Sequence, residues 1–279
     1  MTRTRNLNGV GKYFSLIVLF IFLAIMLVPF FIVIINAFKT PVEYANNGPM
    51  ALPQGFNLNG MIDFWNRVDF TTKLLNSAVI SLTVAVLAVV VSLLNSYALG
   101  IGKIKGRTFF LVFFIMANFL PQEALAYPLY YFAKFFHIYD SLVAVIIIFT
   151  VIQSAFGTYL LTSMFSTFPK ELIEAARIDG CNKFQILTKI VTPISISTLS
   201  VLFTFFFIWT WNEFFLPLIM LISNDKQTVP IAISVLQGQH NMDATTTAAS
   251  ALLGILPCIL FFILFQRTLT RGVTAGSIK

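Results

Sequence analysis

Charged residues are scarce in this sequence, at 10% of the 279 residues, whereas an average soluble domain has roughly 25%. In their place the chain carries 58% hydrophobic residues, including 31 phenylalanines. A soluble globule of this size has a large surface to cover with charge, so this composition excludes most soluble classes. It indicates a protein whose surface is largely in contact with lipid.

Residues that form disulfides, metal sites or nucleotide sites are few as well. Cys181 lies in a polar stretch and Cys258 in an apolar run, so we expect no disulfide between them. His137 and His240 are far apart, and no CxxC or HExxH spacing is present. No GxxxxGK followed by Ser or Thr occurs that could wrap a phosphate. We therefore expect no catalytic residue, no metal and no cofactor on this chain.

Six apolar stretches are long enough for a helix that spans a bilayer, which needs about 20 residues. They cover residues 13–37, 74–99, 108–132, 141–165, 194–221 and 247–265. The first is too long for the apolar part of a signal peptide, so we interpret it as a retained helix. The predicted fold is an all-α polytopic membrane protein with a single transmembrane domain, residues 1–279.

The basic residues indicate how these spans are oriented. If the N-terminus is cytoplasmic, 13 of the 18 lysines and arginines fall on the cytoplasmic side, as the positive-inside rule requires. The other five are Lys39, Arg67, Lys73, Lys134 and Lys226. The charge of +7 is thus a topology signal, and we expect both termini in the cytoplasm and no nucleic-acid partner.

A polar segment at 169–193, between the fourth and fifth spans, predicts a cytoplasmic helix-turn-helix. It reads PKELIEAARIDGCNKFQILTKIVTP, with Glu171 and Glu174 near the positive end of the first helix dipole and Gly180 as a left-handed cap. Ala175 and Ala176 form a small patch edged by Glu174, Arg177 and Asp179, which could accept another protein. From composition alone, a hairpin that merely joins two spans remains an alternative.

The spacing of this segment resembles a known motif. Glu174-Ala175-Ala176, Gly180, Ile190 and Pro193 are similar to the EAA loop of permease subunits in bacterial binding-protein-dependent ABC importers, although Thr192 stands where that family usually has Leu. Other segments are similar to the six-helix subunit of the maltose-type carbohydrate branch of this family. These segments are Asn76-Ser77, residues 178–180, Trp211-Asn212-Glu213-Phe214 with Pro217, and Phe265-Gln266-Arg267.

This resemblance implies a multi-pass subunit of the bacterial inner membrane that is not itself an enzyme. Its expected partners are a second, non-identical permease, an ATPase dimer that binds ATP and Mg²⁺, and an extracytoplasmic solute-binding protein that delivers a sugar or oligosaccharide. The residues expected to couple to the ATPase are Glu171, Glu174, Ala175, Ala176, Arg177, Asp179 and Gly180.

Polar groups within the spans are candidates for the substrate path, because an ionisable group inside a membrane is costly. Glu123 lies in the third span and Glu213 in the fifth, and aromatic faces beside carboxylates suit a sugar. The candidate path residues are Glu123, Tyr127, Trp211, Asn212 and Glu213. The alternative is that Asn212 and Glu213 only fix helix packing.

An outward loop rich in amides contains Gln237, Gly238, Gln239, His240 and Asn241. By resemblance it contacts the docked binding protein; otherwise it is a solvated connector. Rival functions are an importer of a non-sugar solute such as a polyamine or an anion, a stand-alone secondary carrier, which predicts inverted repeats, and an intramembrane enzyme using Glu123 and Glu213.

Overall fold

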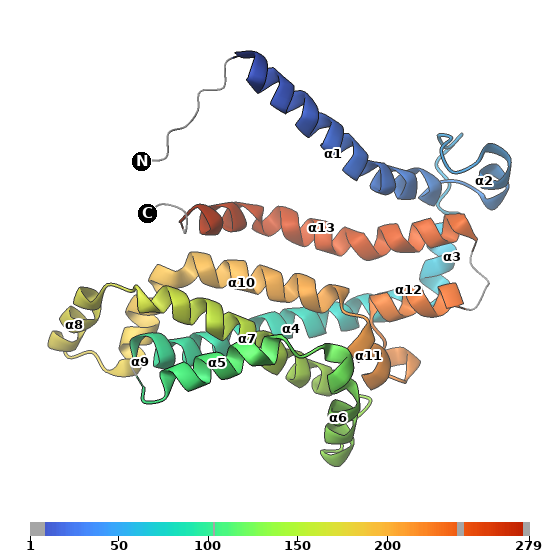
Figure 1. Ribbon diagram of the computed structural model, residues 1–279. Helices are drawn as coiled ribbons and strands as arrows, with labels where there is room; N and C mark the ends of the chain where they lie inside the picture. Colours follow the sequence, from blue (N-terminus) through green and yellow to red (C-terminus); the bar gives the residue numbers. More distant parts are fainter. Residues whose placement is uncertain (1–8, 103, 239–242, 276–279) are drawn as a thin grey trace. The chain divides into compact units, whose positions relative to one another are not determined.

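The computed structural model describes residues 9–102, 104–238 and 243–275, and these contain helices and no strands (Figure 1). The long helices are α1 (Gly9–Ala37), α4 (Phe70–Ser96), α7 (Leu142–Ser166), α10 (Thr192–Asn212) and α13 (Ala244–Ala275). Shorter helices are α2 (Pro41–Asn47), α3 (Asn59–Arg67), α5 (Arg107–Asn118), α6 (Gln122–Phe135), α8 (Lys170–Ile178), α9 (Lys183–Ile186), α11 (Phe215–Met220) and α12 (Val229–Gly238). The π-helical turns η1 (Tyr97–Ile101) and η2 (Leu187–Val191) extend α4 and precede α10, and η3 (Asn224–Lys226) is a 3₁₀ turn.

Five helices in the described part of the chain are long and apolar enough to cross a membrane, and the count is six if α5 and α6 form one broken span. The coarse prediction of a polytopic helical membrane protein is confirmed. The predicted third span, 108–132, is not one straight helix, because α5 and α6 are inclined by 101°.

The break between α5 and α6 follows from Pro121. Proline has no N–H to donate, and it disfavours helical backbone at the preceding residue. Pro121 is extended, with ψ 135°, and α6 begins after it. Glu123 consequently lies in the first turn of α6 and is exposed, whereas a continuous span would have placed it in the helix interior.

The predicted fifth span, 194–221, is also divided. α10 ends at Asn212, Glu213 is extended, and Glu213 Oε1 accepts a hydrogen bond of 3.2 Å from the backbone N–H of Phe215. Glu213 therefore satisfies a backbone donor at the start of α11, which otherwise would have no partner.

The described residues fall into two compact units, one within 69–234 and 256–279 and the other within 1–68 and 235–255. In the larger unit α4, α7 and α10 pack together, with α8 and α9 at one end and α6 and α11 at the other (Figure 1). Gly157 of α7 allows the close approach, since a Cβ there would lie 2.2 Å from Ser92 Oγ of α4 and 2.9 Å from Phe206 Cζ of α10. Ser92 Oγ also donates to the Ser154 carbonyl at 3.2 Å. Small residues thus bring these helices together, as is common in membranes.

The smaller unit is held by small side chains as well. Ala37 at the end of α1 packs with Ala248 and Ala249 of α13. Lys39 is buried here, and its Nζ donates to Asn36 Oδ1 at 2.9 Å and to the Gly48 carbonyl at 3.0 Å. Two oxygen acceptors thus compensate part of the cost of burying this ammonium group.

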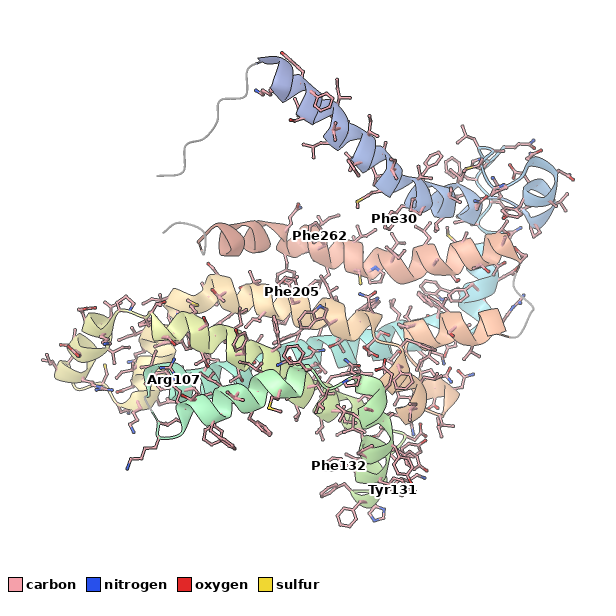
Figure 2. All side chains as sticks on the ribbon, viewed as in Figure 1. Phe30, Arg107, Tyr131, Phe132, Phe205 and Phe262 are labelled. Carbon is pink, nitrogen blue, oxygen red and sulfur yellow. The ribbon has the colours of Figure 1, made fainter. Side chains whose placement is uncertain are left out.

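Large apolar side chains project from the outside of many helices. Phe30 of α1, Phe132 of α6, Phe205 of α10 and Phe262 of α13 are exposed (Figure 2). In a soluble protein so much exposed apolar surface would favour aggregation, whereas in a bilayer it is covered by lipid or by another subunit.

Candidate functional site

The segment 169–193 begins with α8. This helix packs against the end of the helix bundle with its apolar side. Ile173 and Ala176 of α8 are buried. A cavity of about 420 Å³, lined among others by Arg107, Phe165 and Glu174, separates part of α8 from η1 and α7. Tyr97 Oη donates to the Lys183 carbonyl at 3.1 Å and ties η1 to α9.

Gly180 ends α8 in the way that the sequence predicts. Its φ of +81° is in the left-handed region, where glycine has no steric penalty. Its N–H donates to the Arg177 carbonyl at 3.1 Å, and the N–H of Cys181 donates to the Ala176 carbonyl at 2.9 Å. These bonds satisfy carbonyls at the helix end and turn the chain toward α9.

The second half of the segment begins at a capping box. Asn182 Oδ1 accepts from the N–H of Gln185 at 2.9 Å, and Gln185 Oε1 accepts from the N–H of Asn182 at 2.8 Å. The helix then continues through η2 into α10 without a break. Thr192, the departure from the family pattern, donates its hydroxyl to the Leu187 carbonyl at 2.8 Å inside this helix.

The outer surface of this segment carries apolar residues that the sequence analysis did not single out. Ala176 faces the protein, whereas Ala175 is exposed together with Glu171, Glu174, Arg177 and Asp179. Beside them Ile178 is 86% exposed and Phe184 69% exposed. The missed signal was two large apolar residues next to the turn of a polar hairpin, and no described residue covers them.

A recess of about 410 Å³ lies between the start of α6, the middle of α7 and the end of α10, within the roughly 300–1,000 Å³ range of small-molecule sites. Two of the predicted path residues, Asn212 and Glu213, line it. Its polar lining is completed by Asn118, Gln122 and Gln153, and its apolar lining includes Phe149, Phe156 and Trp209.

The other three path candidates lie elsewhere. Trp211 is buried and stacks on Phe207 with ring centroids 5.7 Å apart, so it serves the packing of α10. Glu123 and Tyr127 are exposed on α6, and Tyr127 Oη donates to Tyr131 Oη at 3.1 Å. None of these three lines the recess.

Gln153 is the residue of the recess that the sequence analysis missed. It is 7% exposed, and its Nε2 donates to Thr210 Oγ1 at 2.8 Å. Its signal was a lone carboxamide in the apolar fourth span, where a polar side chain needs a partner. Of the loop residues predicted to contact a binding protein, Gln237 and Gly238 belong to the end of α12, and Gln239, His240 and Asn241 lie outside the described residues.

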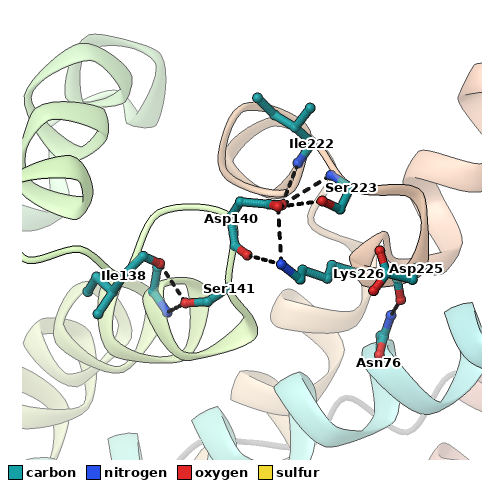
Figure 3. A network of polar contacts seen from close by, with 9 residues as sticks. Asn76, Ile138, Asp140, Ser141, Ile222, Ser223, Asp225 and Lys226 are labelled. Carbon is teal, nitrogen blue, oxygen red and sulfur yellow. Dashed lines mark hydrogen bonds and ion pairs between the residues drawn. The ribbon is translucent and has the colours of Figure 1, made fainter.

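A polar cluster centred on Asp140 ties the turn between α6 and α7 to the segment after α11 (Figure 3). Asp140 Oδ1 accepts from the N–H groups of Ile222 at 3.0 Å and Ser223 at 3.1 Å. Lys226 Nζ donates to the Asp140 carbonyl at 2.7 Å and forms an ion pair with its Oδ2 at 3.1 Å. The hydrogen bonds from Ser223, followed by Lys226, lower the pKa of Asp140 to about 2, although burial opposes them.

We expect Asp140→Asn to cost about 2 kcal/mol at neutral pH, because it removes hydrogen bonds to a charged acceptor. The pKa of an unfolded aspartate is about 3.9. Since the folded pKa is lower, the carboxylate stabilises the fold above about pH 4, and this contribution is lost as the pH falls toward 2. Thermal unfolding of the purified variant in detergent should differ most from wild type near pH 6 and less at pH 3. Asp63→Asn is the control, since Asp63 is an exposed aspartate on α3 and takes no part in this cluster.

These features define a polytopic helical membrane protein with a helical hairpin exposed at one end of its bundle. Residues 97–275 match the family described as binding-protein-dependent transport system inner membrane component. The chain belongs to this family. The family is the permease component of ABC transporters, which is not itself catalytic, so the chain is a multi-pass membrane permease component.

Similar proteins support this assignment over the whole chain. The inner membrane ABC transporter permease protein YcjP of Escherichia coli K12 is 31% identical over 280 residues, covering 100% of this chain and 99% of YcjP. The arabinooligosaccharides transport system permease protein AraQ of Halalkalibacterium halodurans is 30% identical, covering 93% of this chain and 94% of AraQ. The diacetylchitobiose uptake system permease protein DasC of Streptomyces coelicolor is 28% identical, covering 99% of each chain.

A solved structure shares the fold. It is a chain of a bacterial ABC transporter involved in the import of the acidic polysaccharide alginate, with a TM-score of 0.81 over 95% of this chain and 99% of that chain. The sequence identity is 20%, so this likeness concerns the fold alone.

Proposed function

We propose that this chain is one of two non-identical permease subunits of an ATP-driven importer for a sugar or an oligosaccharide. The cargo is supported by relatives named for arabinooligosaccharide and diacetylchitobiose transport. A solute-binding protein delivers it on the outer side, and a separate ATPase dimer binds ATP and Mg²⁺ on the inner side.

The proposed topology has six spans, with α5 and α6 together as the third. Both termini and the helix-turn-helix of α8 and α9 then lie in the cytoplasm, which follows from the 13 basic residues on that side. The Asp140 cluster and the end of α12 lie on the opposite side, where a binding protein would meet them.

The observation that carries the proposal is the exposed apolar surface of α8 and α9. We call this surface the docking face, and it consists of Leu172, Ala175, Ile178 and Phe184. Its apolar side chains are exposed, and exposed acidic residues lie beside them. An apolar centre with a polar rim is the usual composition of a protein–protein interface. The proposed binding partner of the docking face is the ATPase subunit. When the ATPase moves, α8 would move with it and displace the helices against which Ile173 and Ala176 pack.

A charge in the docking face should release the ATPase. We expect Ile178→Glu to lower the amount of ATPase that co-purifies with the permease about tenfold or more, because a carboxylate would be buried in an apolar contact without a partner. Thr167→Glu is the matched control, since Thr167 is exposed just before α8 and outside the docking face. Equal recovery of ATPase with Ile178→Glu and with wild type would contradict this docking face.

The function itself is tested by purifying the chain from detergent-solubilised membranes of its host. A second permease and an ATPase should co-purify, and ATP hydrolysis should rise with one sugar-loaded binding protein and not with the unloaded one. If the chain purifies alone and still moves solute without ATP, it is a secondary carrier. If only a polyamine-loaded or anion-loaded binding protein stimulates hydrolysis, the proposed cargo is wrong.

A further inference from the structure

The cavity between α8 and the helix bundle is lined by several basic side chains. Arg107 from the start of α5 and Lys170 and Arg177 from α8 line it, together with one carboxylate, that of Glu174. Arg107 lies at the end of the bundle that carries α8 and α9 (Figure 2). Three cations and one carboxylate give the cavity an excess of positive charge. Its volume of about 420 Å³ is large enough for a small anionic group.

These three cations are not neutralised within the part of the chain that the structure describes. None of them forms an ion pair there, and the side chains of Lys170 and Arg177 donate no hydrogen bond to a described residue. The guanidinium of Arg107 donates to Ser166 Oγ, and Ser166 Oγ donates to the Thr162 carbonyl at 2.6 Å. Arg107 is thereby held in place while most of its N–H groups can still donate. An anion bound among these like charges would relieve their repulsion.

The cavity and the docking face lie on different sides of α8. With 3.6 residues per turn, Lys170, Glu174 and Arg177 follow at spacings of four and three and share one side of the helix. At about 100° per residue, the docking-face residues of α8 lie more than about 120° around the helix from this side. An ATPase on the docking face would therefore not compete with a ligand in the cavity.

The surroundings of Arg107 favour a lipid as the source of the anion. Phe110, one turn further along α5, is 42% exposed, and Phe109 and Phe113 are exposed as well. In the proposed topology Arg107 begins the third span on the cytoplasmic side, at the level of the phospholipid phosphates. A phosphate beside Arg107 would thus have apolar surface next to it for acyl chains. Basic pockets between transmembrane helices on this side of a membrane commonly bind anionic headgroups.

We propose that this cavity binds the phosphate of an anionic phospholipid of the inner leaflet, such as phosphatidylglycerol, with Arg107, Lys170 and Arg177 as its cationic ligands. The planar guanidinium groups of the two arginines match the spacing of phosphate oxygens. The bound headgroup contacts α5 and α8 at once, so it holds α8 against the bundle. The inference goes beyond the proposed function, because the lipid site does not depend on which solute is carried. It uses the proposed topology only to assign the leaflet.

Direct measurement of lipid binding tests this site. The permease is purified in the complex in which it occurs, freed of lipid in mild detergent, and titrated with dioleoylphosphatidylglycerol or dioleoylphosphatidylcholine, and native mass spectrometry counts the bound lipids. We expect the first phosphatidylglycerol to bind about tenfold more tightly than phosphatidylcholine. Combining Arg107→Gln with Lys170→Gln should weaken that first phosphatidylglycerol about tenfold and leave phosphatidylcholine unchanged, because two charge-assisted contacts to the phosphate are lost.

The matched control combines Lys105→Gln with Lys189→Gln. It removes the same charge from two exposed lysines that do not line the cavity. Ser166→Ala separates packing from charge, since it removes the hydroxyl that Arg107 contacts and keeps all three cations. Both should bind phosphatidylglycerol within about twofold of wild type. Lys170→Gln alone serves if the double variant does not fold, because Lys170 is exposed, and it should weaken binding about threefold.

Several results would overturn the lipid site. Equal affinity of the wild type for the two lipids is one, and an equal loss in the lysine control pair is another, because net charge alone would then attract the lipid. If the double variant does not fold and Lys170→Gln binds as wild type, the inference is wrong. Millimolar inorganic phosphate is added as a competitor. Displacement of phosphatidylglycerol would identify a site for a soluble phosphate instead, whereas retention of the lipid supports the headgroup site.

Discussion

Replacing Gly157 with valine is expected to remove most of the folded permease from the membrane. A Cβ at this position would lie 2.2 Å from Ser92 Oγ, 2.8 Å from Ser92 Cβ and 2.9 Å from Phe206 Cζ. The serine hydroxyl could rotate away, but its Cβ and the phenyl ring belong to packed helices and can only move with them. Overpacking a core commonly costs 1–3 kcal/mol, and we expect at least about 3 kcal/mol here because two neighbouring helices must separate.

The measurement is the amount of monodisperse permease recovered from membranes by gel filtration in mild detergent. Gly55→Val is the control, since a Cβ at Gly55 meets no atom within 4 Å in the part of the chain that the structure describes. Gly157→Ala combined with Ser92→Gly removes two of the three clashes and should recover more protein than Gly157→Ala alone. If Gly157→Val is recovered in wild-type amounts, the close packing of α4, α7 and α10 described here is wrong.

The helix pattern was readable from the sequence for most of the long apolar runs, including two in which a proline, Pro29 or Pro257, lies inside a continuous helix. The predicted segments 141–165 and 74–99 agree closely with α7 and with α4 plus η1, because an unbroken apolar run in lipid must satisfy its backbone as a helix. The predicted segments 108–132 and 194–221 were too continuous. Their breaks depend on Pro121 and on the side chain of Glu213, whose effect on the backbone is local and does not alter average hydropathy.

The turn of the 169–193 segment was equally readable, because a left-handed residue after an amphipathic helix strongly favours glycine. The recess was not readable in the same way. Asn212 and Glu213 were found because polar groups in a span are conspicuous, yet Trp211, beside them in sequence, faces the core. Which of three adjacent residues faces a recess depends on where α10 ends and how it is rotated against α7, and both are properties of packing.

Replacing Gly180 with valine is expected to separate transport from ATP hydrolysis without expelling the permease from the membrane. Among the described residues no atom lies within 4 Å of a Cβ at Gly180, so the substitution causes no clash with them. The cost is conformational, because a β-branched residue at φ +81° is strained by about 1–3 kcal/mol. Relieving that strain changes the turn between α8 and α9 and therefore the direction in which the docking face is presented.

For Gly180→Val, ATP-dependent uptake in proteoliposomes should fall about tenfold or more, while the amount of inserted protein stays close to wild type. Gly180→Asn is the matched control, because asparagine is of similar size and tolerates left-handed backbone, so it should retain most of the uptake. Normal uptake by Gly180→Val would show that the turn does not transmit movement. Equal loss in both variants would mean that the glycine is needed for close contact with the ATPase rather than for its backbone conformation, since in this chain alone the space around Gly180 is open.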